Sequence, residues 1–335
     1  MSSFKPYKET PTFMKLGVLL VPELSTETNF KLARQAGATD VVLPCPGFTL
    51  EALKAEIDRI KATGLNVSVI ERFVPHDKLV HGLPGKEEQL ENIKKLIVHM
   101  GKCGVKTFCY NWMPNDDWTR TSTTEQERGG ALSTSFDISK QPQRLAGQTL
   151  QQDLISEEAL WQNLKDFLTE VLPVCEANNV DLALHPDDPP TSTLANGQKQ
   201  IVYDIDRIEK VTNLVQSERN GVCFCQGTFA SRGIDIPSAI RRLNKKIKFV
   251  HARNVVCEDE GTGCKFRETW QDNGDIDYVE AMKAYKEVGF DGVIRPDHVP
   301  SMAGEDNSIP GYHMLGRLYA LGYLKGLMEA VGKSL

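Results

Sequence analysis

Long hydrophobic runs are the first feature that this sequence lacks. No stretch approaches the roughly 20 consecutive apolar residues that a membrane helix needs. The opening residues, MSSFKPYKETPTF, contain no apolar signal core. We therefore expect no membrane partner and a cytoplasmic location.

Basic tracts and several familiar motifs are also missing. The formal net charge is −6 without any basic cluster, so we expect no nucleic-acid partner. No Gly-x-Ser-x-Gly motif occurs, which argues against a serine hydrolase. The stretches 227–228 and 261–263 lack a full phosphate-binding fingerprint. The eight cysteines include no Cys-x-x-Cys pair, so we expect reduced thiols, any special one being a candidate ligand or nucleophile.

The sequence does contain a regular alternation of apolar and amphipathic segments. Short apolar, β-branched runs are typical of strands buried on both faces. These runs are 15–21, 40–45, 66–71, 105–111, 180–186, 221–227, 247–254 and 292–298. Helical periodicity fills the gaps at 49–63, 86–103, 156–178, 275–288 and 313–332. Gly64 is the expected C-cap of the first of these helices.

Eight strand–helix units in succession predict an α/β fold, a (β/α)8 TIM barrel. A doubly wound open sheet is the alternative, but it normally uses fewer strands. No linker or internal repeat interrupts the chain. We therefore expect a single catalytic domain over 1–335, with 1–13 as an N-terminal extension.

Three connections are too long for ordinary loops. They are 112–154, which is polar, 187–200, which contains Asp-Asp-Pro-Pro, and the irregular stretch 255–274. Each follows a predicted strand and therefore belongs to the C-terminal face of a barrel, where active sites lie. Because long loops are usually lids or binding loops, we expect 112–154 to be a long active-site loop.

Potential metal ligands collect at the ends of the last four predicted strands. They are His185, Cys225, His251 and Asp297. Taken singly, a histidine there is often structural, a cysteine is often a small buried hydrophobe, and an aspartate often caps a turn. Their joint occurrence at four successive strand ends predicts a divalent-metal site, which suits Zn²⁺ or Fe²⁺ at least as well as Mn²⁺. Cys223, two residues before Cys225, is expected to be a core residue.

Other polar residues lie at or just beyond strand ends. His298 follows Asp297, so the chain must turn there for both to reach one site. The candidates for binding an anionic polyol are Arg72, Asn111, Arg120, Arg253 and Arg295. Any one of these arginines has the alternative role of joining a strand to a helix. Tyr312 opens the last helix at the same mouth, where an anchoring aromatic is the alternative. The remaining histidines named here are expected to be solvated: His76, His81 and His99.

Several motifs resemble those of mannonate dehydratases, from about residue 66 to the C-terminus. They are VIERFVPHDKLVHGLPGKEEQLENIKK, FCYNWMPNDDWTRT, ALHPDDPP, CFCQGT, FVHARNV, IRPDH and PGYHMLGRLYALGYLKGLMEA. The resemblance implies a barrel related to xylose isomerases, Mn²⁺ as cofactor, and dehydration of D-mannonate to 2-keto-3-deoxygluconate in hexuronate catabolism. It also implies the four metal ligands above, with His298 and Tyr312 as the proton-handling pair.

The sequence departs from that family's pattern at three places. Val299 stands where the family has glycine, Arg267 where it has histidine, and 191–200 replaces a Gly-Leu-Pro-Arg-Ile-like segment. We expect these changes at the substrate mouth, affecting which sugar acid is used. The alternatives to a hydro-lyase are a metal-dependent sugar isomerase or epimerase and a non-catalytic sugar-acid-binding descendant. We further expect a homo-oligomer acting on a small-molecule sugar acid.

Overall fold

The barrel predicted from the sequence is present. The computed structural model describes residues 12–114, 118–141 and 154–333. Eight parallel strands close in the order β1-β12-β9-β8-β7-β4-β3-β2. They are β1 (Lys15–Leu19), β2 (Asp40–Leu43), β3 (Asn66–Glu71), β4 (Thr107–Tyr110), β7 (Asp181–Leu184), β8 (Asn220–Cys225), β9 (Ile247–Ala252) and β12 (Val293–Pro296). Each falls within or against its predicted range, and this closed ring rules out an open sheet.

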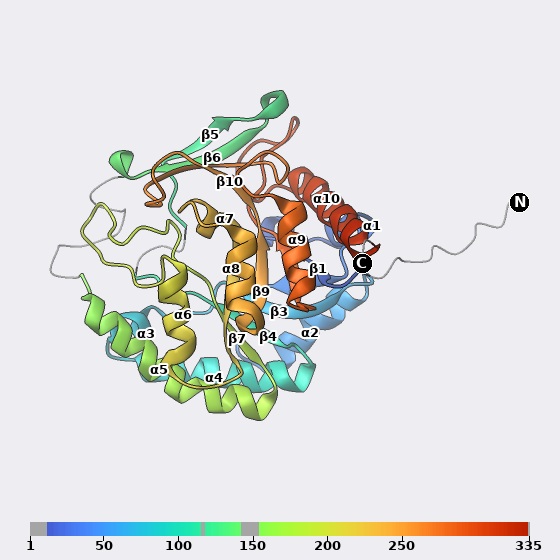
Figure 1. Cartoon of the computed structure of the whole chain (residues 1–335). Helices are drawn as coiled ribbons and strands as arrows, with labels where there is room; N and C mark the ends of the chain where they lie inside the picture. Colours follow the sequence, from blue (N-terminus) through green and yellow to red (C-terminus); the bar gives the residue numbers. More distant parts are fainter. Residues whose placement is uncertain (1–11, 115–117, 142–153, 334–335) are drawn as a thin grey trace, which may run out of the picture.

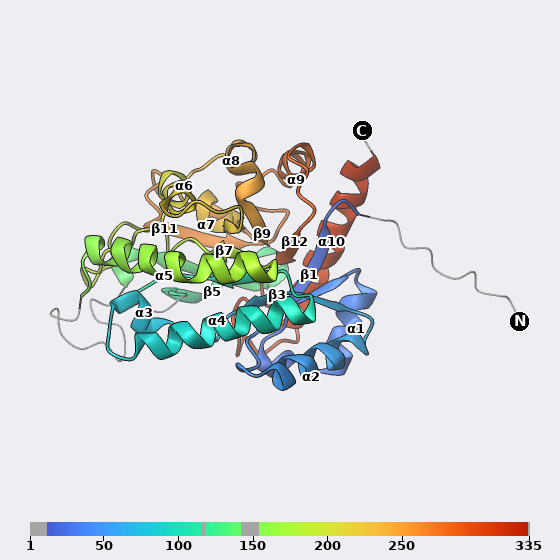
Figure 2. The ribbon, with the colours of Figure 1, turned by 90° about the horizontal axis from the view of Figure 1, so that it is seen from below.

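Helices surround this ring on its outer side (Figures 1 and 2). They are α1 (Glu27–Gln35), α2 (Leu50–Lys61), α3 (Asp77–His81), α4 (Lys86–Cys103), α5 (Glu157–Asn178), α6 (Ile205–Leu214), α7 (Gln226–Ala230), α8 (Ile236–Leu243), α9 (Tyr278–Glu287) and α10 (Met314–Lys333). The five predicted helices are confirmed to within a few residues. Gly64 is not the cap of α2: Ala62 is the C-cap, and Gly64 follows it in the left-handed region with φ +83°.

Side-chain caps and apolar faces explain where the longer helices form. Ser156 starts α5 by accepting a hydrogen bond from the backbone N–H of Ala159, and Asp277 does the same for Val279 and Glu280 in α9. Their buried apolar residues recur every three or four positions and pack against the outer face of the barrel. The main core therefore lies between the strands and the helices.

A second, smaller core fills the inside of the barrel. Each of the eight strands contributes one side chain to it, and Tyr312 lies against the same group. The eight are Leu19, Val42, Val69, Cys109, Ala183, Cys223, Phe249 and Val293. We call these eight side chains the interior ring. It closes the barrel as a solid floor, and the expectation that Cys223 is a core residue is confirmed.

An antiparallel sheet lies above the barrel in Figure 1. Its order is β10-β11-β6-β5, from β5 (Ser122–Gln126), β6 (Leu132–Asp137), β10 (Asn254–Cys257) and β11 (Lys265–Thr269). The stretch 255–274 is therefore not irregular, and 112–154 contains a hairpin. Both were misjudged because these strands are short and polar, and their pairing joins segments about 130 residues apart.

Two further expectations concern the chain's periphery. None of the helices in the described ranges combines the length and apolar character needed to cross a membrane. The expected N-terminal extension, 1–13, lies outside the described residues except for Thr12 and Phe13.

Candidate functional site

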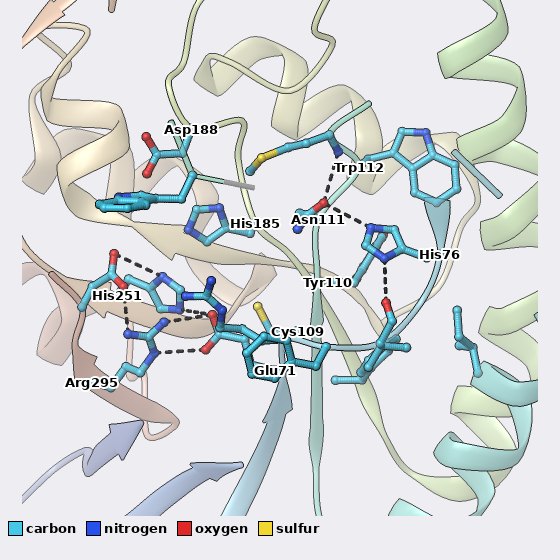
Figure 3. Close-up of a pocket in the computed structure, with 18 of the residues that line it drawn as sticks. Glu71, His76, Cys109, Tyr110, Asn111, Trp112, His185, Asp188, His251 and Arg295 are labelled. Atoms are coloured by element: carbon cyan, nitrogen blue, oxygen red, sulfur yellow. Dashed lines mark hydrogen bonds and ion pairs between the residues drawn. The ribbon is translucent and has the colours of Figure 1, made fainter. Parts of the chain in front are cut away.

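A cavity opens at the carboxyl ends of the barrel strands (Figure 3). The space inside it, counted out to its opening into solvent, is about 790 Å³. Eight of the predicted site residues line it: Arg72, Asn111, His185, His251, Arg295, Asp297, His298 and Tyr312. Trp112, Met113 and Trp118 from the long connection 112–154 also line it, as does Asp188 from 187–200. Both connections therefore border the mouth, as expected.

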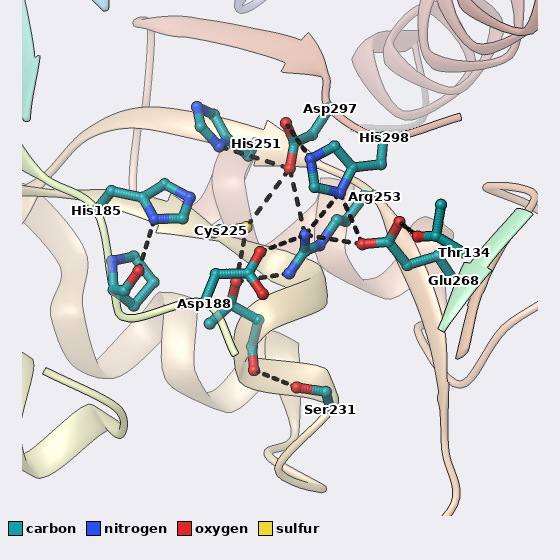
Figure 4. A network of polar contacts seen from close by, with 12 residues as sticks. Thr134, His185, Asp188, Cys225, Ser231, His251, Arg253, Glu268, Asp297 and His298 are labelled. Carbon is teal, nitrogen blue, oxygen red and sulfur yellow. Dashed lines mark hydrogen bonds and ion pairs between the residues drawn. The ribbon is translucent and has the colours of Figure 1, made fainter. Parts of the chain in front are cut away.

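Three of the four predicted metal ligands line this cavity, and the fourth, Cys225, lies beside them (Figure 4). Donor atoms of His185, Cys225 and His251 all lie within 4.8 Å of one another. Asp297 Oδ2 lies 3.9 Å from Cys225 Sγ and 3.8 Å from His251 Nδ1. Four strand ends that are distant in sequence thus direct one sulfur, two imidazoles and one carboxylate toward one place.

Hydrogen bonding around these residues fits a divalent cation. Neither buried ring nitrogen of His251 makes a well-aligned hydrogen bond, although Nε2 lies 3.2 Å from Glu71 Oε1 and Nδ1 lies 3.8 Å from Asp297 Oδ2; this incomplete hydrogen bonding beside two carboxylates suits a cation. His185 Nδ1 lies 2.6 Å from the carbonyl oxygen of Pro186. That contact makes Nδ1 the donor and leaves Nε2 with its lone pair for a cation.

The sulfur and the carboxylate of this set also suit a cation. The Thr228 hydroxyl donates to Cys225 Sγ over 3.1 Å and so holds the sulfur in place beside the other donors. Although burial opposes it, the neighbouring charges of His298 and Arg295 hold the pKa of Asp297 well below its usual range. We call His185, Cys225, His251 and Asp297 the four-donor set.

His298 and Tyr312 form a contact at the edge of the cavity. His298 Nε2 lies 3.0 Å from the Tyr312 hydroxyl, which in turn accepts a 2.5 Å hydrogen bond from Arg72 Nη1. Burial raises the pKa of Tyr312 to about 12, so the phenol keeps its proton near neutral pH. Asp297 and His298 both lie beyond the end of β12, so the chain turn expected between them is present.

The other side of His298 belongs to a buried ion-pair network. His298 Nδ1 lies 2.7 Å from Glu268 Oε1 and 2.9 Å from Arg253 Nη1. Arg253 also pairs with Asp188 at 2.7 Å, and Arg120 pairs with both Asp188 and Glu268. We call Arg120, Asp188, Arg253 and Glu268 the ion-pair network.

The charges of this network fix its protonation states. Burial opposes ionisation of Glu268 and Asp188, but the two arginines hold the pKa of each carboxyl well below its usual range. An ionised carboxylate accepts hydrogen bonds only. Arg253 Nη1 directs its two hydrogens to Asp188 and Glu268, so we assign the proton of the 2.7 Å contact to His298 Nδ1, which leaves Nε2 as the nitrogen with the lone pair facing Tyr312.

Two of the predicted substrate-binding residues do not line the cavity. Arg120 and Arg253 have side chains 1% and 0% exposed, and their guanidinium groups are engaged by Asp188 and Glu268. Both arginines therefore bind carboxylates of the protein and do not face the cavity. Arg295 does line the cavity, but it is bound to Glu71 through two nitrogens, at 3.0 and 2.9 Å.

The three histidines expected to be solvated are all partly buried. His76 lines the cavity, with Nε2 3.1 Å from Asn111 Oδ1. His76, the N-cap residue of α3, therefore belongs to the wall of the cavity and not to the outer surface. His99 Nδ1 is buried, and His81 Nδ1 lies 2.9 Å from the carbonyl oxygen of Asp77.

Three acidic residues of the site were not predicted. Glu71 ends β3, so the strand-end argument applied to the histidines also applies to it. Asp188 lies in the Asp-Asp-Pro-Pro segment that marked a functional loop. Glu268 belongs to β11 of the antiparallel sheet, and no barrel-based argument leads to it.

The three departures from the family pattern do not line the cavity. Arg267 points to the opposite side of β11 from Glu268 and pairs with Glu127 at 2.7 Å. Val299 is 2% exposed and lies against Gly316 of α10. Gln200, in 191–200, donates to the carbonyl oxygens of Pro189 and Thr191 and so stabilises the backbone that follows Asp188. The expectation that these changes sit at the substrate mouth was wrong.

Glycine is required at one position beneath the ion-pair network. A Cβ atom at Gly227 would lie 2.3 Å from Cγ and 2.4 Å from Nε of Arg253. Real contacts of this kind are much longer, so the side chain of Arg253 crosses α7 only because residue 227 has no side chain.

The backbone at the rim of the cavity is strained. Arg72 and Phe73 are consecutive non-glycine residues with φ of 72° and 57°. Such conformations cost on the order of 1–3 kcal/mol each and persist where surrounding contacts fix them. The turn directs Arg72 inward to Tyr312, whereas the Phe73 side chain is 59% exposed.

Known proteins resemble this chain over most of its length. The D-mannonate dehydratase (UxuA) family model matches residues 28–335. A mannonate dehydratase from Streptococcus uberis is 34% identical over 303 residues, which cover 83% of this chain and 85% of that protein. A mannonate dehydratase from Thermotoga maritima is 35% identical over 315 residues, covering 83% and 86%.

Solved structures agree with these sequence matches. The crystal structure of mannonate dehydratase from Streptococcus suis serotype 2 superposes with a TM-score of 0.86 at 30% identity, covering 97% of this chain and 95% of that one. A xylose isomerase domain protein from Planctomyces limnophilus gives a TM-score of 0.60 at 13% identity, covering 96% and 99%. The second likeness shows the barrel fold alone.

Proposed function

Because this chain belongs to the D-mannonate dehydratase family, we propose that its barrel mouth converts D-mannonate to 2-keto-3-deoxygluconate. The reaction removes the C2 proton and the C3 hydroxyl as one water molecule, and the resulting enol ketonises. One observation carries this proposal: His185, His251 and Asp297 line the same cavity as the His298–Tyr312 pair, and Cys225 lies beside them.

The family is metal-dependent, and the four-donor set is where we propose that a cation is held. Mn²⁺ is our expected ion, with Fe²⁺ and Zn²⁺ as alternatives because one thiolate and two imidazoles also suit them. When bound, the ion supplies positive charge next to the oxygens on which negative charge develops as the C2 proton leaves. All remaining steps are assigned to side chains of this chain.

His298 is the proposed base. Its Nδ1 donates to Glu268, so Nε2 carries the lone pair and faces the cavity. When Nε2 takes the C2 proton, the ring becomes an imidazolium, which the ionised Glu268 stabilises at 2.7 Å. Arg253 opposes this charge, but its guanidinium is shared with two carboxylates, Asp188 and Glu268.

Tyr312 is the proposed acid. It retains its proton, since burial raises its pKa to about 12. The electron pair of the C2–H bond forms the C2–C3 double bond as the C3–O bond breaks, and the phenol donates its proton to the leaving hydroxyl. Arg72 Nη1, 2.5 Å from the phenol oxygen, stabilises the phenolate that remains.

The sugar acid is proposed to lie among Arg72, His76 and Asn111. All three line the cavity, His76 on the far side from His251 in Figure 3, and they offer both donors and acceptors to hydroxyl groups. The apolar walls at Trp112 and Trp118 exclude water from the enol, which reduces side reactions.

A keto-acid assay on purified protein tests the proposed function. We expect D-mannonate with Mn²⁺ to give 2-keto-3-deoxygluconate faster than any other hexonate of a panel. If a keto acid forms only from another hexonate, that hexonate is the substrate and D-mannonate is not. Recovery of an epimer without a keto acid would instead indicate an isomerase or epimerase, and binding without turnover would indicate a non-catalytic descendant.

A further inference from the structure

Two cysteines belong to the interior ring just below the cavity. Cys109 comes from β4 and Cys223 from β8, and their side chains are 3% and 0% exposed. The other six members of the ring are leucine, valine, alanine and phenylalanine. Apolar side chains fill the other six positions, so packing alone does not explain why these two positions carry thiols.

These two thiols lie close to the imidazole ring of His251. The sulfurs of Cys109 and Cys223 and a ring nitrogen of His251 all lie within 4.8 Å of one another. Neither nitrogen of His251 makes a well-aligned hydrogen bond, and this residue is 1% exposed. Its Nδ1 lies 3.8 Å from Asp297, whereas Nε2 lies 3.2 Å from Glu71 Oε1. The ring thus lies between the four-donor set and the thiols.

We propose that Cys109, Cys223 and His251 form a second cation site, selective for a thiophilic divalent ion such as Zn²⁺. Distances of about 2.3 Å to sulfur and about 2.0 Å to nitrogen put donors of one zinc ion roughly 3–4.5 Å apart. The three donors need only a small closing movement to meet that spacing. Glu71, paired with Cys109 in strand register, adds a negative charge beside the site.

The surroundings allow an ion to arrive and to displace protons. Cys109 and His251 line the cavity, and in Figure 3 the sulfur of Cys109 points into it near Glu71, so the mouth gives access. Each sulfur loses its proton to water as it binds, and occupation therefore releases two protons.

Sharing His251 couples this second site to the proposed function. If the four-donor set holds the catalytic cation, then an ion on the thiol pair competes for the same imidazole. Two thiolates favour Zn²⁺ over Mn²⁺. We therefore expect Zn²⁺ to inhibit the Mn²⁺-loaded protein through Cys109 and Cys223.

A cadmium titration tests the site without relying on turnover. The Mn²⁺-loaded protein is titrated with Cd²⁺, while thiolate-to-cadmium absorbance and bound metal by elemental analysis are recorded. Cys223→Ser removes one sulfur with little change of volume, and Cys175→Ser is the matched control because Cys175 is equally buried, on α5. We expect the wild type and Cys175→Ser to bind one more equivalent of Cd²⁺ than Cys223→Ser, with the larger absorbance.

Equal cadmium content and absorbance in the wild type and Cys223→Ser would overturn the site and leave both thiols as packing. If Cys223→Ser does not fold by circular dichroism, Cys109→Ser replaces it with the same readouts and outcomes. For the coupling, half-inhibition of Cys223→Ser should need at least about tenfold more Zn²⁺ than that of the wild type. Equal inhibition would reject the coupling. Absence of any D-mannonate turnover with an intact cadmium count would reject the proposed function alone.

Discussion

Two regions of the molecule meet at His298. Below it, the ends of barrel strands β7, β8, β9 and β12 supply the four-donor set. Above it, the antiparallel sheet supplies Glu268 from β11 and Thr134 from β6, which hydrogen-bond to each other. Glu268 then contacts His298 and both arginines of the ion-pair network.

The two regions differ in what they offer a ligand. The barrel directs unsatisfied donors such as His251 into the cavity, whereas the polar groups of the sheet are already engaged by protein partners. From this difference we propose that the barrel binds and reacts with the substrate, whereas the sheet orients the barrel's side chains. Changes in the barrel should therefore abolish activity, while changes in the sheet should reduce it.

The largest effect is expected for Asp297→Ala. Removing this carboxylate takes a charged member from the four-donor set, so both bound metal and activity should fall, with activity lower by roughly 10⁴-fold or more. Elemental analysis beside steady-state kinetics measures both. An Asp297→Ala protein that keeps its metal content would place the cation elsewhere.

A smaller loss is expected for His298→Asn. The four-donor set stays complete, so metal content should match the wild type, while kcat falls by about 10²-fold to 10⁴-fold because a proton transfer is lost. The same two measurements apply. If metal is lost, His298 is a ligand; if full turnover remains, the base is another residue, with Tyr312 the first to test.

The comparison between barrel and sheet is sharpened by Glu268→Gln. The amide keeps the shape but not the charge, so His298 loses its imidazolium partner and kcat should fall by about 10-fold to 100-fold, less than on removing the ring. The acid limb of the kcat profile should also move, and metal content should not. An unchanged pH profile would show that Glu268 contributes to packing but does not stabilise the imidazolium of His298.

The same substitution should change stability at low pH. The pKa values of Glu268 and Asp188 are depressed in the fold. Their stabilisation is therefore present above their unfolded values of about 4 and is lost as pH falls below them. The free energy of unfolding, measured by thermal unfolding at a series of pH values, should depend less steeply on pH below pH 4 in Glu268→Gln. The slope should be smaller by about 1.4 kcal/mol per pH unit, because one proton fewer is taken up on unfolding. Parallel curves for the two proteins would contradict this.

The smallest effect is expected for Arg267→His, next to Glu268 on the other side of β11. Arg267 is about one-third exposed and pairs with Glu127 outside the cavity. Such pairs contribute about 0.2–1 kcal/mol, so kcat and substrate preference among hexonates should stay within about twofold. A change of preferred hexonate would restore the idea that residue 267 selects the substrate.

The barrel half of this site was predictable, because parallel strands bring their carboxyl ends to one mouth whatever their separation in sequence. His185, Cys225, His251 and Asp297 follow from that rule alone. Glu268 did not, since the pairing of β11 with β6 has no local signal. Arg120 and Arg253 were misassigned because their position does not reveal which carboxylates face them. The expected homo-oligomer stays a prediction, which light scattering can test.

Gly227 gives a rule for comparing other sequences with this one. The side chain of Arg253 and any side chain at position 227 exclude each other, since a Cβ there would lie 2.3 Å from Arg253 Cγ. The two positions should therefore have changed together during divergence. Relatives that retain the arginine should have glycine opposite it. Relatives with a larger residue there should have lost the arginine, and the histidine that corresponds to His298 should be oriented differently in them.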